Sequence, residues 1–120
     1  MFKSFLTLLL VCLLFSCSGK EEEKIKLTSS EEDKVISIYS EAVEALKKGD
    51  SYYAAKKFKE AENLMPQTEW AAKASLMAGY ADYSRNAYTK SIFKLERHIK
   101  KYPADVNIPY AHYLIAICYF

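Results

Sequence analysis

Hydrophobic side chains recur at three- and four-residue spacing along most of the chain, which is the pattern of amphipathic helices. The first such stretch follows Ser29 and Glu32, which have the spacing of a capping box, and it ends at Gly49. A second stretch comes directly after this glycine and is closed by Pro66. The pattern therefore predicts a helix–turn–helix hairpin over residues 29–66.

The hairpin recurs with a period of 37 residues, which takes Pro66 to Pro103 and the small residue Ala42 to Gly79. A fixed period of small residue, turn and proline indicates a helical solenoid, in which each hairpin packs on the next. The sequence thus predicts a second repeat over residues 67–103. Small residues should leave room for bulky neighbours where helices cross; the small ones are Ala42, Ala54, Ala61 and Gly79, and the bulky ones are Phe58 and Leu95.

Turn and cap residues occupy the corresponding places in both hairpins. Asn86 replaces Gly49 at the tight turn, and asparagine tolerates the left-handed backbone or caps the next helix. Asp50 or Ser51 is expected to cap the second helix of the first hairpin. Asn107 is expected to cap one further helix.

Residues 104–120 predict the first helix of a third repeat, with Pro109 inside its first turn, where a missing N–H is tolerated. The stretch from Tyr113 to Phe120 is apolar and is followed by no polar capping helix, although solenoids need such caps for solubility. We therefore expect the sequence to be the front part of a longer protein. The predicted fold is all-α, a solenoid of about two and a half helical hairpins.

The N-terminus has a different pattern, because the run from Phe5 to Phe15 is broken only by Thr7 and has no polar face. Its 11 residues are too few to span a bilayer core, which needs about 20. With the positive charge of Lys3 before it, the run is typical of an export signal. Residues 1–16 are therefore predicted to be a signal peptide.

The signal ends in the sequence Leu14-Phe15-Ser16-Cys17, which resembles a bacterial lipobox, although Phe15 is bulkier than the usual residue at its position. This resemblance implies an N-acyl chain and an S-diacylglycerol group on Cys17, and several acyl chains together give stable anchoring. Ser18 favours the outer membrane over the inner one. Residues 17–28 are predicted to be the lipidated cysteine and a flexible tether. The alternative is an ordinary cleaved signal with an unmodified cysteine.

Composition and charge exclude several classes of function. The 120 residues carry 17 basic and 15 acidic side chains, a net charge of +2, which gives no reason to expect nucleic acid as a partner. Of the three cysteines, only Cys118 belongs to the predicted helical body, so no disulfide is expected. His98 and His112 lack the spacing of a metal site, and no phosphate loop or catalytic motif occurs. We expect neither an enzyme nor a cofactor or metal.

Two resemblances follow from these residues. Gly49, Ala54, Phe58, Ala61 and Pro66 are spaced as in the second half of a tetratricopeptide repeat, although Ile38 and Ser75 stand where tryptophan is common and the period exceeds the usual 34 residues. Together with the lipobox, residues 14–120 resemble the N-terminal portion of the BamD family, the tetratricopeptide lipoproteins of the outer-membrane β-barrel assembly machinery.

The second resemblance implies a scaffold anchored by lipid at the periplasmic face of the outer membrane, where β-barrel proteins are assembled and inserted. It implies binding to BamA, to accessory Bam lipoproteins and to unfolded β-barrel precursors. The alternative is another envelope tetratricopeptide lipoprotein, for example an adaptor for peptidoglycan enzymes.

In tetratricopeptide arrays the first helix of each pair lines a concave groove, so the resemblance implies a peptide groove on these helices. The candidate groove residues are Ile36, Tyr39, Val43, Leu46 and Lys47; Lys73, Leu76, Tyr80, Tyr83 and Ser84; and Tyr110, Tyr113 and Ile117. A tyrosine-rich, partly basic groove suits an extended peptide with aromatic and acidic groups. The alternative is packing between repeats.

Other conspicuous side chains have simpler interpretations. Trp70 is expected to be a packing anchor. The second helices carry basic residues that are expected to form solvated outer faces, with contact to anionic lipid or a partner as the alternative. These residues are Lys56, Lys57, Lys59, Lys94, Arg97, Lys100 and Lys101.

Overall fold

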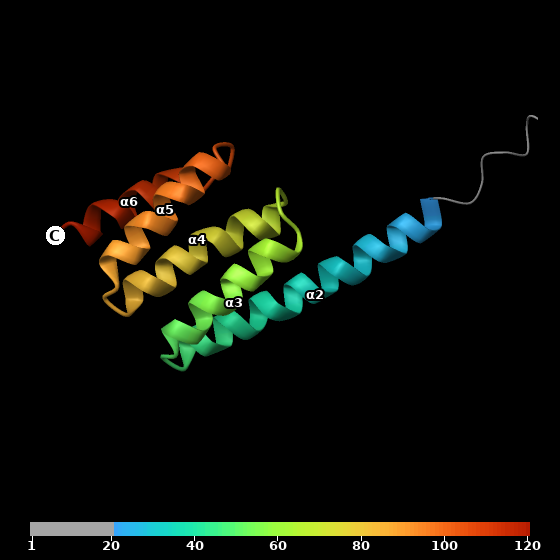
Figure 1. Ribbon diagram of the computed structural model, residues 1–120, viewed down its shortest axis with the longest axis horizontal. Coiled ribbons are helices and arrows are strands. Elements are labelled where there is room, and N and C mark those ends of the chain that lie inside the picture. The colour runs from blue at the N-terminus through green and yellow to red at the C-terminus, as the bar shows by residue number, and fades with distance from the viewer. Residues whose placement is uncertain (1–20) are drawn as a thin grey trace, which may run out of the picture. The chain divides into compact units, whose positions relative to one another are not determined.

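The computed structural model describes residues 21–120, with side chains from residue 29 onward. Its helices are α2 (Glu21–Lys47), α3 (Ser51–Leu64), α4 (Glu69–Ser84), α5 (Tyr88–Lys101) and α6 (Ile108–Cys118), and this part of the chain contains no strand. Successive helices run in opposite directions, so α2 with α3 and α4 with α5 form hairpins that α6 follows (Figure 1). The all-α prediction is confirmed. Residues 31–120 form one compact unit, to which the packing below refers.

The first helix begins earlier than the sequence indicates. The sequence predicts a tether over residues 17–28 and a capping box at Ser29, but α2 already includes residues 21–28 and runs through Ser29 without a break. Residues 21–23 are three glutamates, which favour the positive end of a helix dipole, and neither glycine nor proline follows until Gly49. A serine–glutamate pair at capping spacing therefore stands inside a helix here and does not start one.

The turns between the helices match their residues. Gly49 and Asn86 both have left-handed backbone, with φ of 86° and 62°. Asp50 caps α3, since its carboxylate accepts a hydrogen bond from the backbone N–H of Tyr53 at 3.0 Å. Gln67 also has a positive φ of 66°, which no feature of the sequence indicates.

Asn107 occupies the cap position of α6, and Pro109 lies in the first turn, as expected. The asparagine side chain makes no cap hydrogen bond, however. Its amide donates to the carboxylate of Asp105 at 3.2 Å instead. The helix start is thus in its predicted place, but the side chain stabilises the preceding loop.

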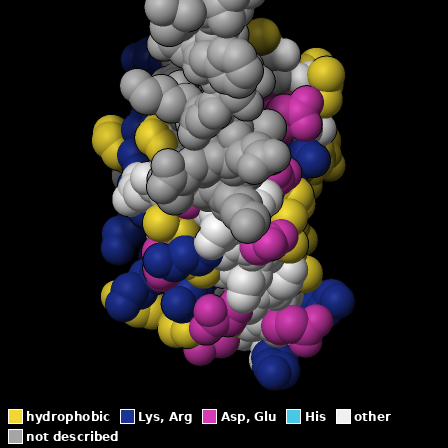
Figure 2. Space-filling model, turned by 90° about the vertical axis from the view of Figure 1, so that its right-hand side faces the viewer, with side chains coloured by type: hydrophobic (Ala, Val, Ile, Leu, Met, Phe, Trp, Pro, Cys, Tyr) yellow, Lys and Arg dark blue, Asp and Glu magenta, His cyan; other side chains and the backbone are white. Residues whose placement is uncertain are grey.

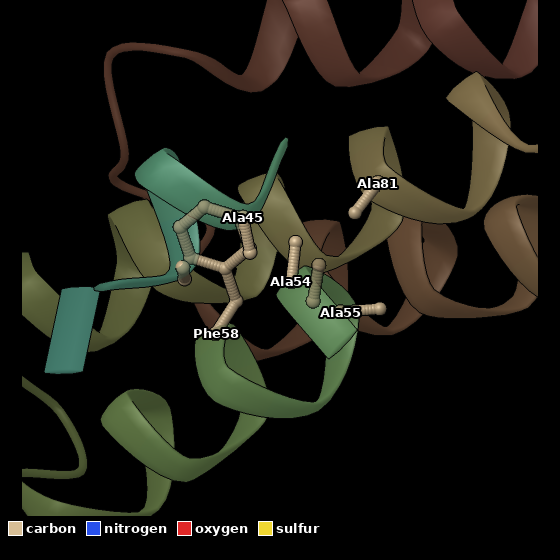
Figure 3. Packing of buried hydrophobic residues seen from close by; sticks show 7 residues of the cluster. Ala45, Ala54, Ala55, Phe58 and Ala81 are labelled. Atoms are coloured by element: carbon tan, nitrogen blue, oxygen red, sulfur yellow. The ribbon is translucent and has the colours of Figure 1, made fainter. Parts of the chain in front are cut away.

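The first core cluster consists of one large side chain among small ones. Phe58 is fully buried and packs against alanines of α2, α3 and α4. Figure 3 shows its ring directed toward Ala45 of α2, with Ala54 and Ala55 on its own helix. The alanines let three helices approach one another around one aromatic ring, as the spacing of small residues predicts. The cluster therefore joins the first hairpin to the second.

The equivalent contact in the second hairpin is between Gly79 and Leu95. A Cβ atom added at Gly79 would lie 2.7 Å from both Cγ and Cδ2 of Leu95, which is fully buried. This is closer than carbon atoms pack. Glycine is therefore required at position 79 by the close approach of α5 to α4, which confirms the role that the repeat assigns to it.

Candidate functional site

Among the candidate groove residues, Tyr39 of α2 packs against two other aromatic rings. Tyr39 contacts Phe58 and Trp70 edge-on, with ring centroids 5.1 and 5.6 Å apart. The indole N–H of Trp70 donates to Glu32 at 3.3 Å, and the ammonium of Lys73 lies 5.0 Å from the indole ring. Burial raises the pKa of Tyr39. Trp70 is thus the packing anchor that the sequence predicts, and Tyr39 is half-buried against it.

Five tyrosines from three helices lie close together farther along this face, and we call them the tyrosine cluster: Tyr80 and Tyr83 of α4, Tyr88 of α5, and Tyr110 and Tyr113 of α6. Ring centroids of Tyr80 and Tyr83 are 6.2 Å apart, and those of Tyr83 and Tyr88 are 6.0 Å apart. Tyr110 and Tyr113 stack at 6.2 Å with 25° between their planes. The cluster therefore contains four of the predicted groove residues.

The cluster is partly accessible to solvent. Tyr110 and Tyr113 are 41% and 58% exposed, whereas Tyr80 and Tyr83 are half-buried against the core that contains Leu95 and Leu114. Burial raises the pKa of Tyr110, and the neighbouring tyrosines at positions 80, 113 and 83 raise it further. The cluster therefore consists of a packed base on α4 and an exposed edge on α6.

The remaining groove candidates divide between core and surface. Leu76 is only 6% exposed and packs against Leu95 and Ala111, so it belongs to the core and not to an accessible groove. Side chains of α5 and α6 cover it. The half-buried candidates are Val43, Leu46 and Ile117, and the exposed ones are Ile36, Lys47, Lys73 and Ser84. Lys47 pairs with Glu44 at 3.4 Å.

Charge is divided unequally between first and second helices. The first helices, α2, α4 and α6, together carry ten acidic and five basic residues, whereas α3 and α5 carry three acidic and eight basic ones. Figure 2 shows acidic and basic side chains interspersed with hydrophobic ones on one face of the molecule. The groove candidates Lys47 and Lys73 are thus basic, but the helices that carry them are acidic overall.

A buried carboxylate connects the two hairpins and corrects the prediction of freely solvated outer faces. Glu62 of α3 has no exposed side-chain surface, and it pairs with Lys59, Arg97 and Lys101 at 3.1, 2.9 and 3.0 Å. The hydroxyl of Tyr102 donates to the same carboxylate at 3.2 Å. Burial alone would raise the pKa of Glu62, but hydrogen bonds from the two lysines and the charge of Arg97 bring it below its ordinary value.

A second buried carboxylate, Asp82 of α4, is 1% exposed and binds Arg85 at 2.8 Å and Lys94 at 2.6 Å. Lys57 in turn bridges Glu41 and Glu60 at 3.3 and 3.2 Å. Five of the seven cations predicted to be solvated therefore bind carboxylates. The two exceptions are Lys56 and Lys100, which are exposed and have no ion-pair partner among the described residues.

Sequence reasoning missed both carboxylates, although a weak indication exists for each. Glu62 directly follows the small core residue Ala61, and Asp82 follows Ala81 in the same way. An acidic residue beside the apolar stripe of a helix needs a cation where a neighbouring helix covers it. The partner helix could not have been inferred from either position alone.

Comparison with known proteins agrees with this arrangement of helices. The family model described as YfiO, outer membrane lipoprotein, matches residues 31–120, which is most of the chain and all of its compact unit. The chain belongs to this family. The predicted resemblance to the BamD family is therefore confirmed, and the YfiO/BamD repeat is tetratricopeptide-like.

Curated relatives carry the same name in several bacteria. The chain is 38% identical over 104 residues to the outer membrane protein assembly factor BamD of Caulobacter vibrioides, covering 87% of this chain and 33% of the relative. It is 29% identical over 86 residues to that of Rickettsia prowazekii, covering 72% and 34%. The chain thus spans about a third of the length of these YfiO/BamD relatives. No solved structure matches it.

The described residues of this YfiO/BamD chain contain no cluster of three side chains that could hold a metal ion, and none of the described helices is long and apolar enough to cross a membrane. His98 is buried beside Asp105, with Nε2 3.1 Å from the carboxylate, whereas His112 is exposed on α6. Cys118 is a buried free thiol, 3.6 Å from the hydroxyl of Ser91. Cys17 lies outside the described residues.

Proposed function

We propose that the chain is part of a lipid-anchored scaffold that assembles β-barrel proteins into the outer membrane, and that the tyrosine cluster binds unfolded barrel precursors. Membership of the YfiO/BamD family supports the assembly role, since the relatives are named outer membrane protein assembly factors. BamA and accessory Bam lipoproteins are the proposed partners within the assembly machinery. The scaffold binds and positions its partners without catalysing a reaction.

The observation that carries the precursor site is the spacing of the rings in the tyrosine cluster. Side chains on one face of an extended strand repeat every two residues, or about 6.6–6.8 Å. The ring centroids of Tyr110 and Tyr113 are 6.2 Å apart, as are those of Tyr80 and Tyr83. Alternate aromatic side chains of an extended precursor can therefore meet successive tyrosines of the cluster. Strands of outer-membrane barrels alternate in this way and carry aromatic girdles.

A charge placed on the exposed edge of the cluster tests this site. Tyr113→Glu puts a carboxylate on a residue that is 58% exposed, so the fold should survive. We expect the Kd for a labelled terminal-strand peptide to rise at least about tenfold, or about 1.4 kcal/mol, in a fluorescence anisotropy titration. Tyr52→Glu is the matched control, since Tyr52 is 61% exposed on α3. Equal affinities for both folded variants would disprove the site.

Membership of the assembly machinery is tested by co-purification with the full-length protein, because this chain spans only a third of its relatives. We expect BamA to be recovered. Recovery of peptidoglycan enzymes without BamA would instead support the adaptor function.

We further propose that Cys17 carries the lipid that holds the protein at the periplasmic face of the outer membrane. The proposal rests on the lipobox at positions 14–17 and on the family description as an outer membrane lipoprotein. Metabolic labelling with palmitate should label the protein, and Cys17→Ala should remove the label. A label that persists in this variant would show that the lipid is elsewhere.

A further inference from the structure

The outer surface of α3 and α5 is basic and carries an exposed phenylalanine on α5. Phe93 of α5 is 68% exposed, and Lys90 and Lys100 lie three residues before and seven residues after it, on the same side of the helix. Lys56 occupies the outer side of α3. These four residues define what we call the outer patch.

The lysines of the outer patch are available to a ligand. Lys56, Lys90 and Lys100 are exposed, and none has an ion-pair partner among the described residues. Of the carboxylates around them, Glu62 and Asp82 are buried under cations and Glu60 pairs with Lys57. Glu96 is exposed three residues after Phe93, on the same side of α5 as Phe93 and Lys100.

A groove of about 890 Å³ adjoins the outer patch between the two hairpins and has the same sign of charge. Six basic side chains line it against two acidic ones, Glu60 and Asp82. Tyr52 and Tyr53 lie at its α3 wall. The groove thus extends the positive surface from Lys56 on α3 to Lys90 on α5, and it offers room for anionic groups between them.

We infer that the outer patch docks on a surface of anionic phospholipid. Lysines near such a surface gain about 1 kcal/mol each, which corresponds to roughly fivefold in binding per residue. An exposed phenylalanine among lysines is the composition of a helix face that lies in the headgroup region. An acidic peptide would use the lysines but would leave Phe93 in water, so the aromatic residue favours the membrane.

Docking would complement the lipid anchor of the proposed function, on which this inference rests. A lipid at Cys17 fixes one point of the chain to the membrane, and a basic patch is a typical second attachment. The patch would hold α3 and α5 against the membrane and leave α4 and α6, with the tyrosines of the cluster that these two helices carry, facing away from it.

A tryptophan reporter measures docking directly. Residues 17–120 are coupled through Cys17 to a maleimide lipid in vesicles. Cys118 is buried and therefore should not react with the maleimide. The chemical tether is present whether or not cells acylate the protein. The variant Trp70→Phe/Phe93→Trp places its single tryptophan in the outer patch. With 30% phosphatidylglycerol, brominated lipid should quench this tryptophan, whereas Trp70 of the unsubstituted chain should stay unquenched. Circular dichroism checks that both chains are folded.

Charge reversal tests the electrostatic part of the inference. Lys56→Glu/Lys90→Glu/Lys100→Glu should lower the ratio of docked to undocked protein at least about tenfold. Three charge reversals at exposed lysines of α2 and of the turn that follows it should keep this ratio within about twofold of its value for the original chain. These control positions are Lys34, Lys47 and Lys48. In 1 M salt, where the Debye length is about 3 Å, quenching should disappear.

Three results would overturn the inference. The first is no quenching of the outer-patch tryptophan on anionic vesicles, and the second is equal quenching on vesicles of pure phosphatidylcholine. The third is an equal loss of docking in the two triple variants, because that would indicate attraction by total charge alone. Failure of palmitate labelling at Cys17 would count against the natural anchor and not against docking, since the chemical tether replaces it.

Discussion

Removing the charge of Glu62 should destabilise the fold more than any other loss of a single charge among the described carboxylates. The substitution Glu62→Gln keeps the shape of the side chain but leaves Lys59, Arg97 and Lys101 without their shared anion. Loss of a buried ion-pair partner costs about 3–5 kcal/mol, and that of an exposed one about 0–1. The carboxylate is fully buried, but the three cations are 37%, 36% and 33% exposed, so water can solvate them in the variant. We expect a loss of about 2–3 kcal/mol at pH 7.

The loss should depend on pH in a definite direction. The pKa of Glu62 is lower in the folded chain than its ordinary value of 4.5, so the stabilisation is fully present above that value. It is lost as the pH falls through the lower pKa of the folded state, and the original chain should then approach the variant. Urea unfolding followed by circular dichroism at pH 7 and pH 3 measures both differences.

Glu60→Gln is the matched control, because Glu60 is exposed and pairs only with Lys57. It should lower the free energy of unfolding by less than about 0.5 kcal/mol. A Glu62→Gln variant as stable as this control would refute the reasoning. A large loss that is equal at pH 7 and pH 3 would also refute it, because the loss would then come from packing rather than from charge.

Two further substitutions test the packing of α5. Gly79→Ala should destabilise the chain by about 1–3 kcal/mol, because the new Cβ would lie 2.7 Å from Leu95. In a Leu95→Ala background the same change should cost much less. An equal loss of stability in both backgrounds, measured by thermal unfolding, would contradict the contact. Burial lowers the pKa of His98, which Asp105 opposes, so the unfolded state binds its proton more readily and stability should decline as the pH falls below about 6.5. Urea unfolding between pH 7 and pH 5 should show this decline in the original chain and not in His98→Gln. If the free energy of unfolding falls equally with pH in both chains, His98 is not the cause.

Local features of this fold are those that the sequence could predict. Gly49, Asn86 and Pro66 act within a few residues of themselves, through positive φ and through termination of a helix, so their effects follow from residue type. The contact of Gly79 with Leu95 also follows, because the repeat assigns a small residue and a bulky one to a helix crossing. The early start of α2 was missed because the capping spacing of Ser29 and Glu32 also occurs within helices.

Contacts between distant residues could not be predicted in the same way. Glu62 binds Arg97 and Lys101, which are 35 and 39 residues away in the sequence. The sequence of basic residues on α5 does not indicate which of them pair with a buried carboxylate and which lie in water. The helical period likewise makes Leu76 a groove candidate, because it gives the side of a helix without indicating that α5 and α6 cover that position. The sequence therefore indicates which helices carry the candidate site and on which side of each helix it lies. It does not indicate which of these residues are accessible to solvent.

The buried carboxylates also explain how a chain with a net charge of only +2 can have a distinctly basic outer surface. Glu62 carries one negative charge beneath three cations, and Asp82 carries one beneath two, so each network keeps an excess of positive charge. Because the carboxylates are on α3 and α4 and most of the cations are on α5, the same contacts that hold the hairpins together fix these cations beside the outer patch. Most of the acidic residues that balance them are on α2. Stability and the basic character of the outer surface thus have one physical cause, and the reporter and charge-reversal experiments examine its consequence.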